Sequence, residues 1–262
     1  MKQKVLFGPA GSPVDYKGAA YKAPKYISQE GLDSYEYQSP YGVRIGESSA
    51  NTLKEESEKH DILVSMHAPY YINLCAKEES KLDKSIGHLI AAARAGEWMG
   101  AYRLVFHPGA YLNRKPEKAM EISKNTVNRL FEELEAEGIE EFTFAPETTG
   151  KRTQLGNVGE VVELCATFDH FEPTIDFAHV HARGRGFLNK KEDYNCIFST
   201  IEYGKGGEVK HHTLDESDEY GPDIHDLLSN LIDNGWNANI ICETPLRDVD
   251  SLKMKKIYEE LK

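Results

Sequence analysis

The most constraining feature of this chain is the regular alternation of short apolar or aromatic runs with longer amphipathic segments. The short runs, each four to six residues long, are predicted to form strands at 5–8, 34–38, 62–67, 102–107, 142–147, 174–177, 196–201 and 239–243. Several are continuously apolar instead of alternating, which is typical of parallel strands that helices cover on both faces.

Helices are predicted between these runs, over 48–60, 82–101, 117–138, 157–168, 222–234 and 248–261. In the segment 82–101, Ile86, Leu89 and Ala93 recur near the 3.6-residue period. The segment 117–138 ends at Gly138, a signal for a helix C-terminus. The connection from 178 to 195 shows no clear helical period and is predicted to be a loop.

The number and spacing of these elements predict a closed barrel. Eight strands in 262 residues correspond to roughly one β/α unit per 33 residues, the size expected of an α/β fold of the (β/α)8 TIM-barrel type. We therefore predict one TIM-barrel domain over residues 1–262. An open doubly wound sheet is the alternative fold, but the chain has no Gly-rich dinucleotide fingerprint, so we expect no nucleotide cofactor.

Composition narrows the class of protein. Hydrophobic residues make up 40% of the chain, a globular value, and no apolar run approaches the roughly 20 residues that a membrane span needs. The four cysteines are widely spaced without a CxxC pair, and the apolar stretch near the N-terminus is too short for a signal peptide. These features predict a cytoplasmic protein without a membrane partner, and we expect a monomer.

Residues that commonly bind metals follow or end several predicted strands. They are His67, His107, Glu147, Asp176, His179 and Glu243. In a parallel barrel the C-terminal strand ends surround one mouth, so these side chains are expected to converge. A single histidine at a strand end is more often structural than a ligand, but six such residues at one end make chance a poor explanation. Imidazole and carboxylate ligands suit Zn²⁺ or Mn²⁺, and Glu147 can bridge two ions.

Basic residues gather in the loops expected at the same mouth. They are Lys17, Lys22, Lys25, Arg114, Lys115, Lys151, Arg152, Arg183, Arg185, Lys190 and Lys191. Contacts from lysine and arginine to phosphates supply sequence-independent affinity for DNA. The formal net charge of −12 argues against a polyanionic partner unless such a local patch, or bound cations, offsets it. A solvated charged surface without a partner is the alternative interpretation.

Several motifs together resemble one known family. They are FGPAGSP (7–13), HAPYYINL (67–74), FHPGAYL (106–112), PETTGKRTQLG (146–156), TIDFAHVHARG (174–184), KHHTLDESD (210–218) and ICETP (241–245). In these motifs the chain resembles the endonuclease IV family of apurinic/apyrimidinic (AP) endonucleases, within the xylose-isomerase-like TIM barrels. The resemblance covers nearly the whole chain, and only the motifs taken together are specific.

The resemblance implies a metal-dependent endodeoxyribonuclease that hydrolyses the phosphodiester 5′ to an abasic site in double-stranded DNA, as in base excision repair. Members of the family hold three zinc ions. Carried onto this chain, the three ligand sets are His67, His107 and Glu147, then Glu147, Asp176 and Glu243, and then His179 and His211. Glu147 and Glu243 then take the catalytic role of positioning the ions and orienting the attacking water. Tyr70 matches a DNA-contacting position of the family, with an aromatic of the core or rim as the alternative. Among the basic residues of the mouth loops, the candidate DNA contacts are Lys151, Arg152, Arg183 and Arg185.

The chain departs from the family pattern at two positions. Ile197 stands where the family supplies a histidine to the second metal, and Val209 stands where it supplies a carboxylate to the third. Glu208 substitutes for that carboxylate if the loop is shifted, and His212 can exchange roles with His211. We therefore predict two zinc ions, with Mn²⁺ as an alternative metal, and leave the third ion open.

Two other functions fit the same residues. A sugar isomerase or epimerase on the same barrel needs one divalent ion, for which Glu147, Asp176 and Glu243 are suitable ligands. A degenerate relative that binds DNA without cutting it is the second alternative. The number of bound ions separates the three hypotheses: two or three for the nuclease, one for the isomerase, and none or one for the degenerate protein.

Overall fold

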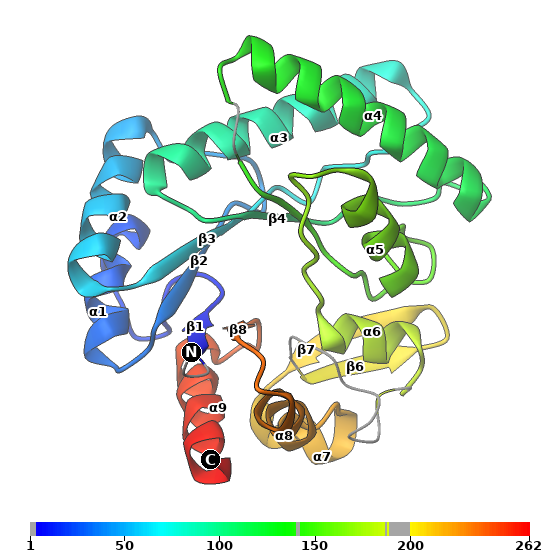
Figure 1. Cartoon of the computed structure of the whole chain (residues 1–262). Helices are drawn as coiled ribbons and strands as arrows, with labels where there is room; N and C mark the ends of the chain where they lie inside the picture. The colour runs from blue at the N-terminus through cyan, green and yellow to red at the C-terminus, as the bar shows by residue number, and fades with distance from the viewer. Residues whose placement is uncertain (1–3, 140–141, 187, 189–199) are drawn as a thin grey trace.

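The computed structural model describes residues 4–139, 142–186, 188 and 200–262. Figure 1 shows short strands at the centre of the molecule with helices packed around them. The parallel strands are β1 (Val5–Pro9), β2 (Ser34–Gln38), β3 (Leu63–His67), β4 (Leu104–Phe106), β5 (Phe144–Pro146) and β8 (Ala238–Cys242). β1 pairs with β8, and β2, β3, β4 and β5 pair in that order.

Backbone hydrogen bonds join the two groups of strands into one barrel wall. The Asp33 N–H donates to the Phe7 carbonyl at 2.9 Å, and the Gly11 N–H donates to the Glu36 carbonyl at 2.9 Å, so β1 lies beside β2. On the other side of β5, Thr174 forms a parallel bridge with Glu147. The wall has the parallel (β/α) architecture predicted from the sequence.

The predicted strand at 174–177 is wrong beyond its first residue. Asp176 is the N-cap of a helix that begins at Phe177, because its carboxylate accepts the His179 backbone N–H at 2.9 Å. The segment from 178 to 195, predicted to be a loop, therefore starts in that helix. Its short length hid the helical period.

The helices occupy the outside of the barrel. They are η1 (Ala20–Lys22), α1 (Ala23–Gln29), α2 (Glu47–His60), α3 (Glu79–Met99), α4 (Pro116–Ala136), α5 (Val158–Thr167), α6 (Phe177–Arg183), η3 (Leu214–Glu216), α7 (Ser217–Tyr220), α8 (Ile224–Asn234) and α9 (Arg247–Leu261). All six predicted helices are present with ends shifted by a few residues. None of the helices in the described part of the chain is both long and apolar enough to span a membrane.

The sequence predicts a strand of the barrel wall at 196–201, but the described residues of this run belong to a separate hairpin. Residues 196–199, including Ile197, lie outside the described part of the chain. Thr200 and Ile201 belong to β6 (Thr200–Gly204), which pairs antiparallel with β7 (Gly207–His212). This hairpin stands beside α6 and forms a sheet of its own (Figure 1).

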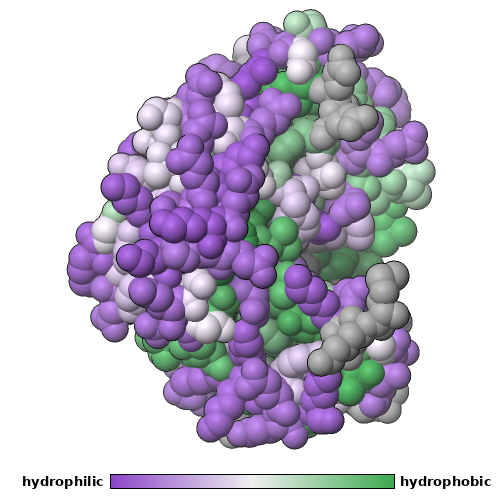
Figure 2. Space-filling model, turned by 60° about the vertical axis from the view of Figure 1, so that its left-hand side comes forward, coloured by the Kyte–Doolittle hydropathy of each residue, from purple (hydrophilic) through white to green (hydrophobic). Residues whose placement is uncertain are grey.

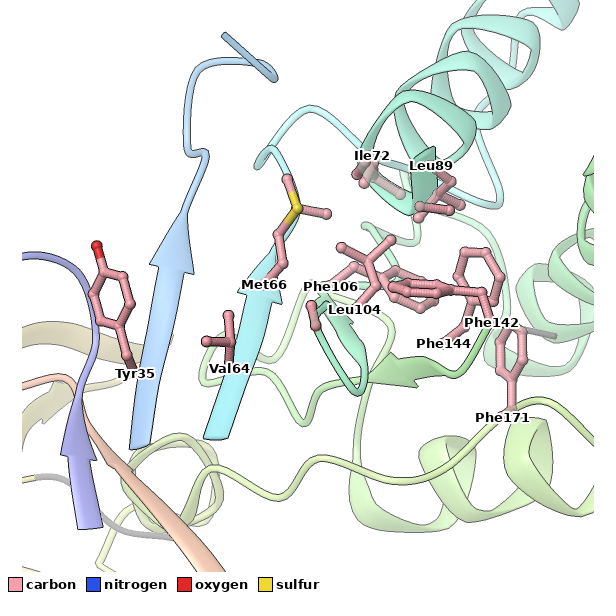
Figure 3. Close-up of a cluster of buried hydrophobic side chains, with 14 of the residues drawn as sticks. Tyr35, Val64, Met66, Ile72, Leu89, Leu104, Phe106, Phe142, Phe144 and Phe171 are labelled. Atoms are coloured by element: carbon pink, nitrogen blue, oxygen red, sulfur yellow. The ribbon is translucent and has the colours of Figure 1, made fainter. Parts of the chain in front are cut away.

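An aromatic cluster anchors β4 and β5 to the helices. The Phe171 ring lies 6.0 Å from Phe106 and 5.8 Å from Phe144, measured between ring centroids. Figure 3 shows Phe106 and Phe144 with Phe142 on the side of the strands that faces Leu89 of α3. These side chains are buried, and each fully buried ring contributes roughly 1.5–3 kcal/mol relative to an exposed one.

Truncating the centre of this cluster is expected to destabilise the barrel. Phe144→Ala removes a ring that is 1% exposed, so the free energy of unfolding should fall by about 3–5 kcal/mol. The matched control is Val162→Ala on α5, whose side chain is 51% exposed and whose loss should cost less than about 0.5 kcal/mol. Denaturant unfolding measures both, and equal losses would contradict this account of the core.

Candidate metal centre

Strand alternation explains why the candidate ligands face the barrel interior. Ser65, Val105 and Ile241 line a small cavity of about 40 Å³ inside the barrel. Residues two apart on a strand share a face, so the side chains two positions later also point inward. Those positions are His67, His107 and Glu243, at or just beyond the ends of β3, β4 and β8.

A first group of ligands consists of His67, His107 and Glu147. One ligand atom from each lies within 4.8 Å of the others. Nε2 of His67 is 3.1 Å from Glu147 Oε2, and Nε2 of His107 is 3.4 Å from the same oxygen. Nδ1 of His67 donates to the Ala68 carbonyl at 2.8 Å, which leaves Nε2 as the ligand atom.

A second group consists of the carboxylates of Glu147, Asp176 and Glu243, again within 4.8 Å of one another. Burial raises the pKa of Glu243 well above its usual range, and the negative charges of Glu147 and Asp176 raise it further. Three converging carboxylates repel one another, and a divalent cation relieves that repulsion. The group therefore has the donor chemistry of a metal site.

A third group consists of Asp176, His179 and His211. Nδ1 of His179 donates to the Thr148 carbonyl at 2.8 Å, so its Nε2 is available as a ligand. The His211 ring, on β7, lies 5.5 Å from the His179 ring between centroids. The hairpin thus brings a side chain from outside the barrel wall to the ligand cluster.

His212 does not take the place of His211. Its Nδ1 lies 3.0 Å from Glu216 Oε1 and its Nε2 lies 3.2 Å from Glu202 Oε2, so both ring nitrogens face carboxylates of the hairpin and η3. The ring also stacks on Tyr220 at 4.0 Å between centroids. These contacts point the side chain away from the ligand cluster.

A β-bulge brings Glu208 to the third group in place of Val209. Glu202 pairs with Lys210 but Tyr203 pairs with Glu208, so Val209 is an extra residue in β7. In a regular strand, residues 208 and 211 would face opposite sides, and the extra residue puts them on the same side. Glu208 Oε2 lies 3.7 Å from His179 Nε2, whereas the Val209 side chain is 58% exposed.

The buried ligands are strongly coupled by charge. Burial alone would raise the pKa of Glu147, but the histidines around it, His107 first, hold that pKa well below its usual range. Burial alone would lower the pKa of His67, but the hydrogen bond and charge of Glu147, with two further glutamates, raise it to about 9. Glu147 and His67 therefore favour opposite charges, which offset each other when the cluster carries no metal.

The ligand cluster lies at the floor of an open cavity of about 760 Å³. Tyr70 is 55% exposed at its rim, with its ring stacked on His107 at 5.6 Å between centroids, and Lys151 also lines the cavity. The surface of the molecule is largely hydrophilic on the face drawn in Figure 2, which carries hydrophilic side chains over much of its area, with apolar residues recessed between them.

Two amide side chains of this cavity were not among the predicted site residues. Gln38 ends β2 and Asn73 follows β3, and both line the cavity beside the ligands. Gln38 has the same position on its strand as His67, its pairing partner on β3. Extending the strand-end rule from metal ligands to amides would therefore have found Gln38.

The arginines predicted to contact DNA differ in their exposure and in their hydrogen-bond partners. Arg152 and Arg185 are exposed, and Arg185 donates to the Lys205 carbonyl at 2.8 Å. Arg183 instead donates to backbone carbonyls of the loop after β5, as at Lys151 (2.7 Å) and Gln154 (3.0 Å). Lys190 and Lys191 lie outside the described residues.

Comparison with known proteins identifies the family. A family model described as the xylose isomerase-like TIM barrel matches residues 24–261. The chain belongs to this family. Among its relatives, an uncharacterized protein of Methanocaldococcus jannaschii is 37% identical over 98% of both chains. A probable endonuclease 4 of Aquifex aeolicus is 25% identical over 73% of this chain and 70% of its own.

Solved structures with different names share the fold of this chain. Endonuclease IV from Thermus thermophilus superimposes with a TM-score of 0.68 and 17% identity over 97% of this chain and 99% of its own. A D-tagatose 3-epimerase-like protein superimposes with a TM-score of 0.71 and 16% identity over 97% and 96%. At these identities the likeness establishes the fold alone.

The raised pKa of His67 predicts how the metal-free protein responds to pH. The folded state holds this proton more tightly than the unfolded state, so the stabilisation is complete below about pH 6.5 and is lost as pH rises through about 9. Denaturant unfolding of chelator-treated protein across this range should show the decline. His67→Gln should make it shallower, and the exposed-site control His170→Gln should not. An unchanged slope in His67→Gln would contradict the assignment.

The bulge predicts which carboxylate matters at the third group. Glu208→Gln should weaken the least tightly bound zinc ion by at least about tenfold, because it removes a charge beside His179. Val209→Asp should not restore that affinity in a Glu208→Gln background, since residue 209 faces solvent. Zinc titration against a chromophoric chelator measures both, and rescue by Val209→Asp would show that the register of β7 is wrong.

Proposed function

We propose that this protein is a divalent-metal-dependent phosphodiesterase that cleaves double-stranded DNA on the 5′ side of an abasic site. The observation that carries the proposal is the adjacency of three ligand groups, which share Glu147 and Asp176. A sugar isomerase of this fold typically needs one ion. Hydrolysis of a phosphodiester benefits from several, because charge develops on both the attacking and the leaving oxygens.

The donor set fits zinc, with manganese as the alternative. Nitrogen and oxygen ligands at buried positions suit Zn²⁺, and the hydrogen bonds from His67 and His179 to backbone carbonyls fix which ring nitrogen faces the cluster. Bound divalent ions supply Lewis-acid stabilisation of phosphate oxygens and make water acidic enough to act near neutral pH. Glu147 and Glu243, both at the centre of the cluster, are assigned to hold the ions and to orient the attacking water.

The proposed DNA contacts come from the rim of the cavity. Lys151, Arg152 and Arg185 are exposed there or in the adjoining loops and can neutralise backbone phosphates. Tyr70 presents its ring beside His107, where it can pack against the sugar of the lesion. An abasic nucleotide has no base to unstack, so moving it towards the ligand cluster costs comparatively little. We also propose that the protein works as a cytoplasmic monomer.

Epimerisation of a sugar is the second candidate function. The cavity of about 760 Å³ falls in the range of about 300–1,000 Å³ typical of small-molecule sites, and the fold is shared with a D-tagatose 3-epimerase-like protein. A single ion held by Glu147, Asp176 and Glu243 would serve it. His67 and His107 favour the nuclease, because they form a further complete ligand group beside those carboxylates.

The direct test is nicking of a DNA duplex that carries one abasic analogue. The protein is expected to cut the lesion strand once, and a chelator should abolish the activity until zinc or manganese is restored. Glu147→Gln should lower the rate at least about 100-fold, because the residue belongs to two ligand groups. The control Glu259→Gln, on the exposed face of α9, should cut at the parental rate.

Two outcomes would contradict the proposal. One is nicking that survives both the chelator and the Glu147→Gln substitution. The other is the absence of nicking by metal-loaded protein, combined with a single tightly bound ion and epimerisation of a ketose; this result would favour the second function.

A further inference from the structure

Arg183 is the last residue of α6, and its position suggests a role different from a phosphate contact. We infer that Arg183 is a positioning residue: it braces the loop 149–156, and this loop seats the β6–β7 hairpin that carries Glu208 and His211 to the ligand cluster. The inference deepens the proposed function and rests on it for the identity of the metal.

The guanidinium of Arg183 already has acceptors for its terminal N–H groups. Nη1 donates to the Lys151 carbonyl at 2.7 Å and to the Thr149 hydroxyl oxygen at 3.2 Å. Nη2 donates to the Gln154 carbonyl at 3.0 Å and to the Tyr111 hydroxyl oxygen at 3.0 Å. Each terminal nitrogen has two hydrogens, so these four contacts use the face that would otherwise grip a phosphate.

The charge of Arg183 is balanced through a tyrosine and a buried glutamate. The Tyr111 hydroxyl donates to Glu160, whose two oxygens lie at 2.8 and 3.0 Å. Glu160 also accepts the backbone N–H groups of Gly156 and Asn157, each at 2.9 Å. Burial and Glu160 together raise the pKa of Tyr111 to about 12, so this hydroxyl keeps its proton. The network fixes both ends of the loop 149–156.

The hairpin rests directly on this braced loop. The Glu208 N–H donates to the Gly150 carbonyl at 3.1 Å, and the Arg152 N–H donates to the Gly206 carbonyl at 3.0 Å. Lys151 and Gly207 form an antiparallel bridge between these two hydrogen bonds. The part of the hairpin that precedes the bulge therefore contacts Gly150, Lys151 and Arg152 of the loop. Arg183 holds the Lys151 carbonyl, and so it fixes the position of this contact.

Two glycines show how close this contact is. A Cβ on Gly207, whose φ is +103°, would lie 2.1 Å from the Gly150 carbonyl oxygen. A Cβ on Gly150 would lie 2.6 Å from the Cβ of Glu208. The two backbones thus touch without room for side chains, so a small shift of the loop has to move the carboxylate beside His179 as well.

The base of the hairpin has a separate anchor. Ile201 on β6 packs with Ala178 and Ala182 of α6 in a small buried cluster. Loss of Arg183 should therefore leave the hairpin attached to the molecule at its base while its tip loses its seat. The expected defect is confined to the third ligand group, because the first two groups stand on the barrel strands and on Asp176.

The test compares Arg183→Met and Arg183→Lys with the control Arg44→Gln, which removes an exposed arginine outside both the loop 149–156 and the hairpin. Zinc is titrated into metal-free protein against a chromophoric chelator, and amide hydrogen exchange is followed over residues 149–156 and 206–208. Both Arg183 variants should bind the weakest zinc ion about 10- to 100-fold less tightly, and the amides of Arg152 and Glu208 should exchange faster. Lysine should not rescue, because it lacks the planar fork. Arg44→Gln should match the parent.

Tyr111→Phe provides a second variant if the substitutions at Arg183 prevent folding. It keeps the ring but removes the link between Arg183 and Glu160, so it should give the same changes in smaller measure. Unchanged exchange and unchanged zinc affinity in Arg183→Met would overturn the inference. A shallower salt dependence of duplex binding with normal exchange would identify Arg183 as a phosphate contact instead. The exchange measurement needs no nuclease activity, so it stands even if the parent protein does not cut abasic DNA.

Discussion

The convergence of buried carboxylates and imidazoles at one end of the barrel is the constraint on which the rest of the structure depends. Glu147 lies within 3.1 to 3.4 Å of nitrogen atoms on three different histidines, in a position that is almost inaccessible to water. Burying such charges costs several kcal/mol per ion unless they are paired or hold a metal. The barrel strands, the α6 N-cap and the hairpin all contribute charged groups to that pairing. The packing of these elements around the mouth therefore depends on the same side chains that are candidate metal ligands.

Two parts of the molecule carry the ligands in different ways. His67, His107, Glu147 and Glu243 end or directly follow parallel strands, and the hydrogen-bond register of the wall fixes their positions. The hairpin ligand His211 and its neighbour Glu208 instead depend on a bulge and on a contact between two loops. A change in the hairpin can therefore alter the metal affinity of the third ligand group without a change in the barrel strands.

An endonuclease IV structure and an epimerase-like structure share this architecture, so the fold does not decide between the two candidate functions. The chemistry at the C-terminal strand ends is more informative: three carboxylates offer ligands to a single ion, whereas carboxylates with several histidines offer ligands to a cluster of ions. In this chain the histidines are present and close together. Tyr70 and Lys151 lie at the same mouth. Aromatic rings and cationic side chains are common in surfaces that bind nucleic acids.

The sequence by itself determined the parallel β/α architecture, the six long helices and the ligands at the strand ends. These features follow from local periodicity and from the rule that parallel strands end on one side, and both are readable from residues such as His67 and Glu147. Tertiary structure alone decided the use of His211 instead of His212 and the substitution of Glu208 for Val209. Arg183, which looked like a phosphate ligand in the sequence, is committed to loop carbonyls by contacts with residues as far away as Tyr111. A bulge and a long-range hydrogen bond leave no periodic trace along the chain, because each depends on a partner strand or loop that local sequence does not specify.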